Sequence, residues 1–244
     1  MRVRSSVRLA AGALVLAGTA MPLVACGRPE ATGVPCGLVV DTTSFFANTN
    51  VRDKIQSYVP RYLDGCATVG FGVVTGVSGA TDCRHPLLRL NPTSADNPGD
   101  NPKTAEGIRA ARRRAAVAVL WQLAQCAQKE KRTRTGSDIL GALDLIARDS
   151  SEYGRLSKIL IISDMIENSP RLNLYKADIR TRGERDRIIR RLQEDRVLPE
   201  LKGTKISILG FGLLATKDPS RLIELRELWD EVFTASGTTG ATYL

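Results

Sequence analysis

One short stretch, residues 158–164, constrains the fold more than any other part of the sequence. It reads Lys-Ile-Leu-Ile-Ile-Ser-Asp, an unbroken aliphatic run that ends in a serine and a carboxylate. Such a run without polar alternation is typical of a strand buried on both faces, as in a parallel sheet. It is also too short for a buried helix, which needs about ten or more residues. Asp164 is then expected beyond the carboxyl end of a strand, where open α/β sheets form binding crevices; the alternative is a turn residue or a helix cap.

Similar apolar runs recur along the chain and alternate with stretches of helical periodicity. Strands are predicted at 37–41, 67–75, 158–164, 205–212 and 241–244, and helices at 50–63, 104–129, 139–147, 172–200 and 219–235. Residues 87–90 follow a turn and are expected to return as an antiparallel partner. This alternation predicts an α/β fold: a doubly wound, mostly parallel sheet with one antiparallel edge strand and helices on both faces.

Composition limits the classes of function. Aromatic residues make up 5% of the 244-residue chain, so no platform for stacking bases is apparent, and with a single histidine, His85, a histidine metal site or a Ser-His centre is hard to build. The formal net charge is +9, but the basic cluster at 109–114 is short and is expected to be a solvated helical face. We therefore expect no nucleic-acid partner and a weak attraction to anionic lipid headgroups.

The first 25 residues have the pattern of a secretory signal. Arginines without acidic residues precede a short apolar core at 9–20, which is too short to span a bilayer. The sequence at 23–27, Leu-Val-Ala-Cys-Gly, resembles the lipobox of bacterial lipoproteins, in which the thiol of Cys26 accepts the lipid. This resemblance implies a lipid anchor on the extracytoplasmic face of the cell membrane or envelope, with residues 26–35 as a tether. The alternative is an ordinary cleaved signal with a chance cysteine.

Polar residues follow two of the predicted strands and precede one helix. Asp41 ends the strand at 37–41, Asp164 ends the strand at 158–164, and the polar loop 135–138 comes before a helix. In a parallel sheet these ends can share one edge, so two carboxylates and several hydroxyl groups would converge. Hard oxygen ligands of this kind suit a divalent cation, Mg²⁺ or Mn²⁺, with Ca²⁺ as a third candidate.

This arrangement resembles a von Willebrand factor A (vWA) domain with its metal-ion-dependent adhesion site. The family pattern is Asp-x-Ser/Thr-x-Ser after the first strand, then a Thr or Ser in a glycine-containing loop, then an Asp after the fourth strand. The order of elements fits from residue 36 to residue 244, which we predict to be the domain. The resemblance implies that the metal ligands are Asp41, Thr43, Ser137 and Asp164.

One position departs from the family pattern. The fifth residue of the first motif should be a serine and is Phe45, and the adjacent Ser44 would point elsewhere unless the loop shifts. The implied metal site is therefore partly degenerate. The alternative is a site without metal, in which Asp41 and Asp164 cap helices or bond backbone amides.

The family resemblance implies protein binding, because the metal usually keeps an open position that a partner's carboxylate fills. The residues themselves agree: we find no nucleophile paired with a base and no phosphate-cradling glycine loop, so we expect a protein-binding domain and not an enzyme. One alternative is a structural envelope lipoprotein without a ligand. Another is a Mg²⁺-dependent hydrolase or phosphatase, although an aspartyl phosphatase would carry a second Asp where Thr43 stands.

Four cysteines remain after Cys26, an even number in a protein predicted to be exported. Cys36 and Cys66 both precede strands, so they lie at the amino-terminal edge of the predicted sheet. Cys83 follows a strand and Cys126 lies near the end of a helix, which places both at the opposite edge. We therefore predict the pairs Cys36–Cys66 and Cys83–Cys126, since the other pairings would cross the sheet. The alternative is four unpaired buried thiols.

Overall fold

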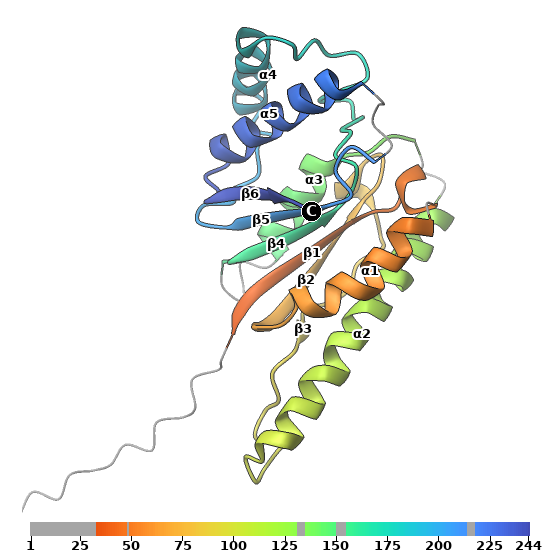
Figure 1. Cartoon of the computed structure of the whole chain (residues 1–244), viewed down its shortest axis with the longest axis vertical. Helices are drawn as coiled ribbons and strands as arrows, with labels where there is room; N and C mark the ends of the chain where they lie inside the picture. The colour runs from red at the N-terminus through yellow and green to blue at the C-terminus, as the bar shows by residue number, and fades with distance from the viewer. Residues whose placement is uncertain (1–32, 48, 131–134, 150–154, 214–217) are drawn as a thin grey trace, which may run out of the picture. The chain divides into compact units, whose positions relative to one another are not determined.

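The computed structural model describes residues 33–47, 49–130, 135–149, 155–213 and 218–244, and Figure 1 shows the sheet and helices that they form. The predicted signal, the lipidation residue Cys26 and most of the predicted tether lie outside the described residues. The first strand begins at Val34, two residues before the predicted start of the domain. Pro35 is tolerated in it because the pairing register shifts between Val34 and Pro35, and irregularities of this kind accommodate proline.

Six strands form one sheet in the order β3-β2-β1-β4-β5-β6. Every neighbouring pair is parallel except β2 and β3, so β3 is an antiparallel edge strand and the predicted fold class is confirmed. Strands β1 and β4, which are far apart in the sequence, lie side by side at the centre, with Val40 opposite Ile162. The strands are β1 (Val34–Asp41), β2 (Cys66–Val74), β3 (Leu88–Arg89), β4 (Lys158–Ile162), β5 (Lys205–Leu209) and β6 (Gly240–Tyr243).

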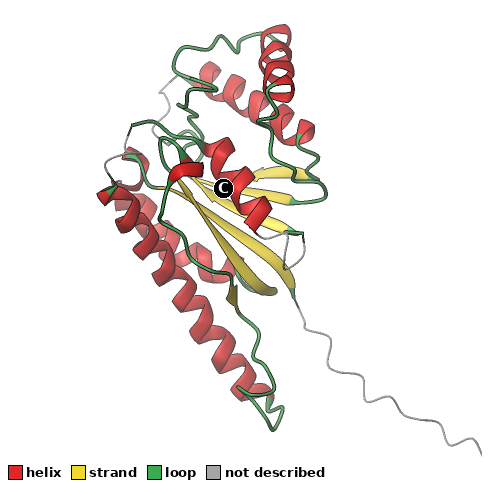
Figure 2. Cartoon of the chain, turned by 180° about the vertical axis from the view of Figure 1, so that it is seen from behind, coloured by secondary structure: helices red, strands yellow, loops and turns green. Residues whose placement is uncertain are grey.

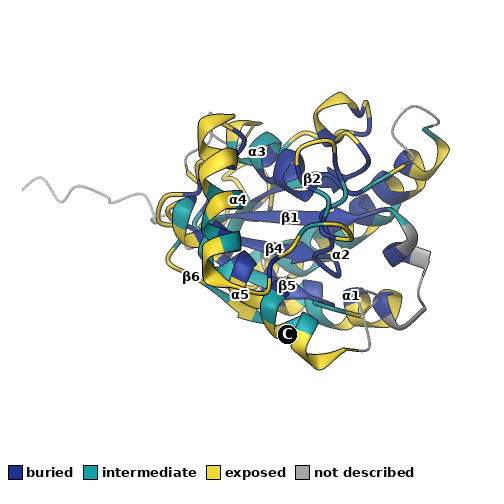
Figure 3. Ribbon diagram, turned by 90° about the horizontal axis from the view of Figure 1, so that it is seen from above, coloured by how far each residue is buried: buried dark blue, intermediate teal, exposed yellow. Residues whose placement is uncertain are grey.

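Helices cover both faces of the sheet, as the unbroken apolar run of β4 predicts. Ile159 and Ile161 face a core that contains α3, α4 and α5, whereas Leu160 and Ile162 face a core that contains α1 and α2. Figure 3 shows the central strands as a buried layer, with α4 exposed along much of its length. The helices are α1 (Thr49–Tyr62), α2 (Pro102–Lys129), α3 (Ile139–Asp149), α4 (Arg182–Glu194) and α5 (Pro219–Ala235), with short 3-10 turns at Ser44–Ala47 and Ser78–Ala80.

The prediction of a mostly helical segment at 172–200 is only partly right, because α4 occupies 13 residues of it. Upstream of α4, side chains bond the backbone two residues ahead: Asn173 accepts from the amide of Tyr175, and Asp178 accepts from that of Arg180. Bonds of this kind offer the backbone a turn in place of a helix. The helix begins only where Thr181 forms a capping box with Glu184.

The sequence of α2 predicts an apolar face of Ile108, Ala111, Ala115, Ala118, Leu120 and Leu123, and this is only partly right, because Leu120 and Leu123 are the members of it that are buried. Ala111 and Ala115 are exposed, and the N-terminal half of α2 extends past the sheet (Figures 1 and 2). Ala118 is exposed as well, on the side of the helix away from its buried residues. The buried face lies in the C-terminal half instead. It consists of Ala116, Val119, Leu120, Leu123, Ala124 and Ala127.

Two disulfides confirm the predicted cysteine pairing. Cys36 is bonded to Cys66, and Cys83 is bonded to Cys126. They close loops with sequence separations of 30 and 43 residues, and loop entropy assigns each closure roughly 3–4 kcal/mol of stabilisation. Within the described ranges, no helix combines the length and the apolar content that crossing a membrane requires.

Candidate functional site

The candidate site lies at the carboxyl edge of β1 and β4. Asp41 is the last residue of β1 and is completely buried. One of its carboxylate oxygens, Oδ1, accepts hydrogen bonds from the Thr43 amide at 3.0 Å and the Thr43 hydroxyl at 2.6 Å. The other, Oδ2, accepts from the Ser163 hydroxyl at 2.8 Å. Asp41 thereby joins the end of its own strand to the end of β4.

Ser137 is held beside Thr43, although 94 positions separate them in the chain: their hydroxyl oxygens are 3.2 Å apart. Two backbone bonds with Asn168 fix the Ser137 loop, at 3.0 and 2.9 Å. Gly136 permits this approach, since it has φ +105° and a Cβ there would lie 2.3 Å from the Asn168 carbonyl oxygen. The structure therefore brings Asp41, Thr43 and Ser137 into one hydrogen-bonded cluster.

Asp164, the fourth predicted ligand, is buried but has fewer partners. Its Oδ1 accepts from the Ile166 amide at 3.1 Å. Burial and, to a smaller extent, the negative charge of Asp41 raise its pKa to about 6. The pKa of Asp41 is raised as well, by complete burial, against the lowering effect of the hydrogen bonds from Thr43 and Ser163. Two carboxylates thus repel one another at this edge.

Among the described residues, no lysine or arginine forms an ion pair with Asp41 or Asp164. Buried carboxylates are normally paired with a cation or coordinate a metal. The donor set here consists of carboxylate and hydroxyl oxygens, which suit Mg²⁺, Mn²⁺ or Ca²⁺. The residues that the structure brings together therefore fit a divalent cation.

The backbone directly after Asp164 is in a left-handed conformation. Met165 has φ 65° although it is not a glycine, and its side chain is completely buried. Its amide donates to Ser163 Oγ at 3.0 Å, and its carbonyl accepts from the indole N–H of Trp229 at 2.8 Å. Such conformations persist where the surroundings determine them, and they cluster at functional sites.

Phe45 does not contribute a ligand. Its side chain is 1% exposed and belongs to the core on the α1 and α2 face. Its ring fills the space above Gly210, where a Cβ would lie 2.5 Å from the Phe45 Cζ. The ring thus packs as a hydrophobic group at the position where the family pattern has a hydroxyl. The side chain of Ser44 lies outside the described residues.

Two functional candidates escaped the sequence analysis. Ser163, whose hydroxyl bonds Asp41, sits at the end of an apolar run and had no signal of its own. Glu167 is completely buried, and its Oε2 accepts from the amides of Ile139 and Leu140, at 2.8 and 3.2 Å, so it caps the start of α3. Burial raises the pKa of Glu167 to about 8.

Asp138 also caps α3. Its Oδ1 accepts from the Gly141 amide at 3.0 Å, and its Oδ2 accepts from the Ser78 amide at 3.0 Å. Ser78 returns a bond from its hydroxyl to the Asp138 carbonyl at 2.6 Å. The residue after Ser137 is therefore fixed to both the helix and the segment that follows β2.

A cleft of about 680 Å³ opens beside the cluster, and Thr43, Ser137, Asn168 and Tyr175 contribute to its lining. Tyr175 is 65% exposed. Its pKa is raised by partial burial and then by the negative charges of Asp164 and Asp41, which places its hydroxyl within the field of both carboxylates. Thr43 and Ser137 of the cluster therefore lie at the wall of this cleft.

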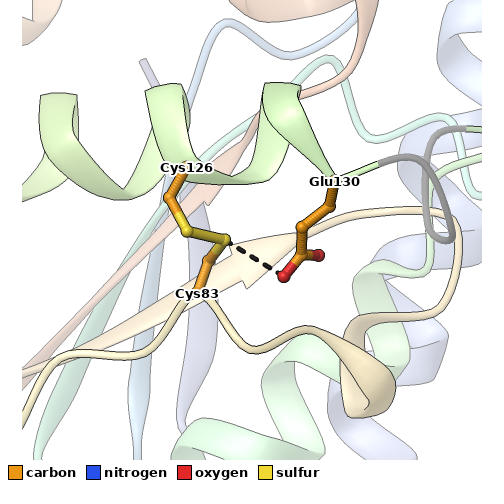
Figure 4. A group of neighbouring side chains, drawn as sticks. All are labelled: Cys83, Cys126 and Glu130. Carbon is orange, nitrogen blue, oxygen red and sulfur yellow. Dashed lines mark hydrogen bonds between the residues drawn. A yellow bond between two sulfur atoms is a disulfide. The ribbon is translucent and has the colours of Figure 1, made fainter.

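A second group of metal-ligating types, Cys83, Cys126 and Glu130, lies at the end of α2 (Figure 4). The two sulfurs are bonded to one another, so neither is available as a thiolate. Glu130 instead accepts bonds from the Thr81 hydroxyl and the Asp82 amide, both at 2.8 Å. With the disulfide closed, this group ties the segment after β2 to the end of α2.

No protein-family model matches the chain, and no curated protein sequence matches it either. In structure, the chain is similar to the pilus adhesin SpaC from Lactobacillus rhamnosus GG in its open conformation, with 13% identity, a TM-score of 0.38 and coverage of 87% of this chain and 28% of that one. It is also similar to the human COPII-coat protein Sec24c, with 12% identity, a TM-score of 0.36 and coverage of 90% and 30%. The chain spans less than a third of the length of either protein, and at these TM-scores we draw nothing further from the likeness.

Proposed function

We propose that this chain is a membrane-anchored, extracytoplasmic binding protein whose vWA-like domain holds a divalent cation and binds another protein. The proposal rests on the convergence of Asp41, Thr43 and Ser137. Asp164 is close enough to Asp41 for the charge of Asp41 to raise its pKa. These residues come from three separate parts of the chain. Hydroxyl and carboxylate oxygens gathered at one sheet edge, without a compensating lysine or arginine among the described residues, favour a cation as the missing partner.

Asp41, Thr43, Ser137 and Asp164 are the residues that would hold the cation. When bound, it would supply a positive charge to which a carboxylate of the partner could attach. The protein's own residues prepare the place: Asp41 orients the Thr43 hydroxyl toward Ser137, and Gly136 lets the Ser137 loop lie against Asn168. Because Phe45 contributes no oxygen, we expect weak binding.

Calorimetric titration of the purified chain with Mg²⁺, Mn²⁺ and Ca²⁺ tests the metal site. We expect one site that is lost in both Asp164→Asn and Ser137→Ala. Asp53→Asn is the matched control, since Asp53 is exposed on α1 and carries the same charge change. No heat with any of the three cations at millimolar concentration would leave the structural envelope lipoprotein as the better description, with Asp41 serving only to join β1 and β4.

A second measurement tests the enzyme alternative. We expect the purified chain with Mg²⁺ or Mn²⁺ to hydrolyse a generic phosphate ester no faster than Asp164→Asn does. Hydrolysis that depends on Asp41 and Asp164 would replace binding with catalysis as the function of the site. The contact of Thr43 with Asp41 argues against an aspartyl phosphatase, because a hydroxyl occupies the position of its second carboxylate.

The lipid anchor has its own test. The chain's tendency to partition into detergent or membranes should be lost in Cys26→Ser, because the proposed acyl chains attach to that thiol. Cys26 is not one of the four cysteines that form the disulfides, so the variant leaves both bonds intact. A variant that stays with the membrane fraction as the unaltered protein does would contradict the lipobox interpretation.

A further inference from the structure

A second hollow, of about 870 Å³, lies between α4 and the loop 169–178. It shares no lining residue with the cleft beside Thr43 and Ser137. The same loop nevertheless borders both, since Asn168 and Tyr175 line the cleft, whereas Ser169 and Asn173 line this hollow. We refer to the hollow as the α4 groove.

Four cationic side chains line the α4 groove: Arg171, Lys176, Arg187 and Arg191. All four residues are exposed, and none lies within ion-pair distance of a carboxylate of any described residue. The guanidinium of Arg191 is held across the groove by a bond to the Arg171 carbonyl at 2.9 Å. Such backbone bonds fix the position of a cation without neutralising its charge.

The acidic residues of the groove do not balance these charges. Asp178 is committed to Arg180, and Glu184 accepts bonds from the amide and hydroxyl of Thr181 in the capping box of α4. Asp195, at the end of the helix, is the third carboxylate in the lining. The groove therefore has four cationic side chains, and Asp195 is the carboxylate in its lining that these two interactions leave over.

Exposed arginines without ion pairs also occur elsewhere among the described residues, Arg61 and Arg114 for example, but in the α4 groove four cations line one hollow. They differ from the arginines that link elements of the fold. In the basic cluster of α2, Arg109 and Arg113 both pair with Glu106, and Arg112 pairs with Asp96. On α4 itself, the buried Arg185 pairs with Glu227 and Glu231 of α5. The chain thus neutralises the arginines that hold its elements together and leaves those of the α4 groove without partners.

We propose that the α4 groove binds an acidic peptide segment of a partner protein. Four cations complement its carboxylates, and the apolar side chains of Leu172 and Ile188, both in the lining, provide contacts for its methylene groups. A flat lipid surface would not reach into a hollow, and no aromatic residue lines the groove to stack a base. This inference goes beyond the cation site and uses none of its residues.

Fluorescence anisotropy with a labelled oligoglutamate peptide tests the proposal on the purified full chain, in chelator, so that the result does not depend on the cation site. We expect Arg187→Ala/Arg191→Ala to weaken binding roughly tenfold and higher salt to weaken binding to the unaltered chain. Lys176→Ala/Arg187→Ala provides a second pair that leaves the Arg191–Arg171 bond in place. The control is Arg61→Ala/Arg114→Ala, which removes two exposed arginines without ion pairs among the described residues from α1 and α2.

An equal loss in the control would show that the peptide responds only to net charge and would overturn the proposal. The proposal would also be overturned if the chain bound oligothymidylate more tightly than oligoglutamate and the groove variants abolished that binding. The same holds if the chain preferred phosphatidylglycerol vesicles to phosphatidylcholine vesicles and the groove variants abolished that preference. Binding that falls in both groove pairs and not in the control supports the proposal, whether or not the chain binds a cation.

Discussion

The two carboxylates of the candidate site sit on neighbouring strands and are held very differently. Asp41 is enclosed by three donors, two from Thr43 and one from Ser163, and both of its oxygens are occupied. Asp164 accepts a hydrogen bond from the Ile166 amide and directly precedes Met165, which has a left-handed backbone conformation. Burial and the charge of its neighbour raise its pKa to about 6.

This difference separates two roles that the family pattern treats alike. The bonds of Asp41 join β1 to β4 and orient the Thr43 hydroxyl, so removing it disturbs the fold as well as the site. Asp164 makes few hydrogen bonds that stabilise the fold, and its negative charge is unfavourable where it lies. Both properties are expected of a carboxylate that binds a cation. The four predictions below test this separation.

The largest effect is expected from Asp41→Ala. Because two hydroxyls and one amide lose their acceptor in a buried place, the free energy of unfolding should fall by roughly 2–4 kcal/mol. Urea unfolding at pH 7 in the presence of a chelator measures this. The exposed Asp53→Ala is the control, and an Asp41 variant as stable as that control would show that Asp41 is not structural.

Asp164→Asn should have the opposite sign. It removes the repulsion with Asp41 but keeps an oxygen for the Ile166 amide, so the metal-free chain should gain on the order of 1–2 kcal/mol at pH 7. Urea unfolding at pH 7 in the presence of a chelator measures this change in the free energy of unfolding. A loss of stability would mean that Asp164 supports the fold as Asp41 does, and the separation of roles would be wrong.

The pH dependence follows from the same carboxyl group. The folded chain holds the Asp164 proton more tightly than the unfolded chain does, so the contribution of Asp164 to stability is lost as pH rises from about 4 through about 6. Cation binding needs the deprotonated form and should be about tenfold weaker at pH 5 than at pH 7. The Asp164→Asn variant should show a flatter dependence of stability on pH. Equal affinities at pH 5 and pH 7 would contradict the role of Asp164 as a ligand.

The smallest effect on the candidate site is expected from Met165→Gly. Glycine removes a left-handed backbone penalty of about 1 kcal/mol but also a fully buried side chain worth about 2–3 kcal/mol, so the net loss should be about 1–2 kcal/mol. Thermal unfolding measures the stability, and calorimetry should find the affinity for the cation unchanged. A variant that loses cation binding while it remains folded would show that the left-handed backbone positions Asp164.

The sheet could be predicted from the sequence because its strands are short and apolar and end in polar residues. The run at 158–162 is buried on both faces, and this alone indicates helices on either side of the sheet. The disulfides followed from the same topology, since cysteines on opposite edges could not meet. Asp41 and Asp164 could be identified for a related reason, because they stand at strand ends, whereas Thr43 and Ser137 were identified from the resemblance to the vWA motif.

The features that could not be predicted from the sequence depend on contacts between residues that are far apart in the chain. The face of α2 was partly misplaced because an alanine-rich helix has several similar apolar stripes, and only the extent of the sheet selects one. The role of Glu167 could not be predicted from the residues around it in the sequence, because it depends on the start of α3 lying beside it in the fold. The α4 groove was hidden for the same reason: the alternating charges of 180–196 suggest a solvated face, and only the structure separates paired from unpaired arginines.

The bond from Trp229 to the Met165 carbonyl gives the protein a built-in optical probe. The indole of Trp229 is buried and donates its hydrogen bond to the residue that directly follows Asp164. The chain's other tryptophan, Trp121, packs against Phe46 on the opposite face of the sheet. Trp121→Phe therefore leaves a single emitter, coupled to the carboxylate that the cation would touch. Its emission wavelength and near-ultraviolet circular dichroism should follow the occupancy of that edge without any added label.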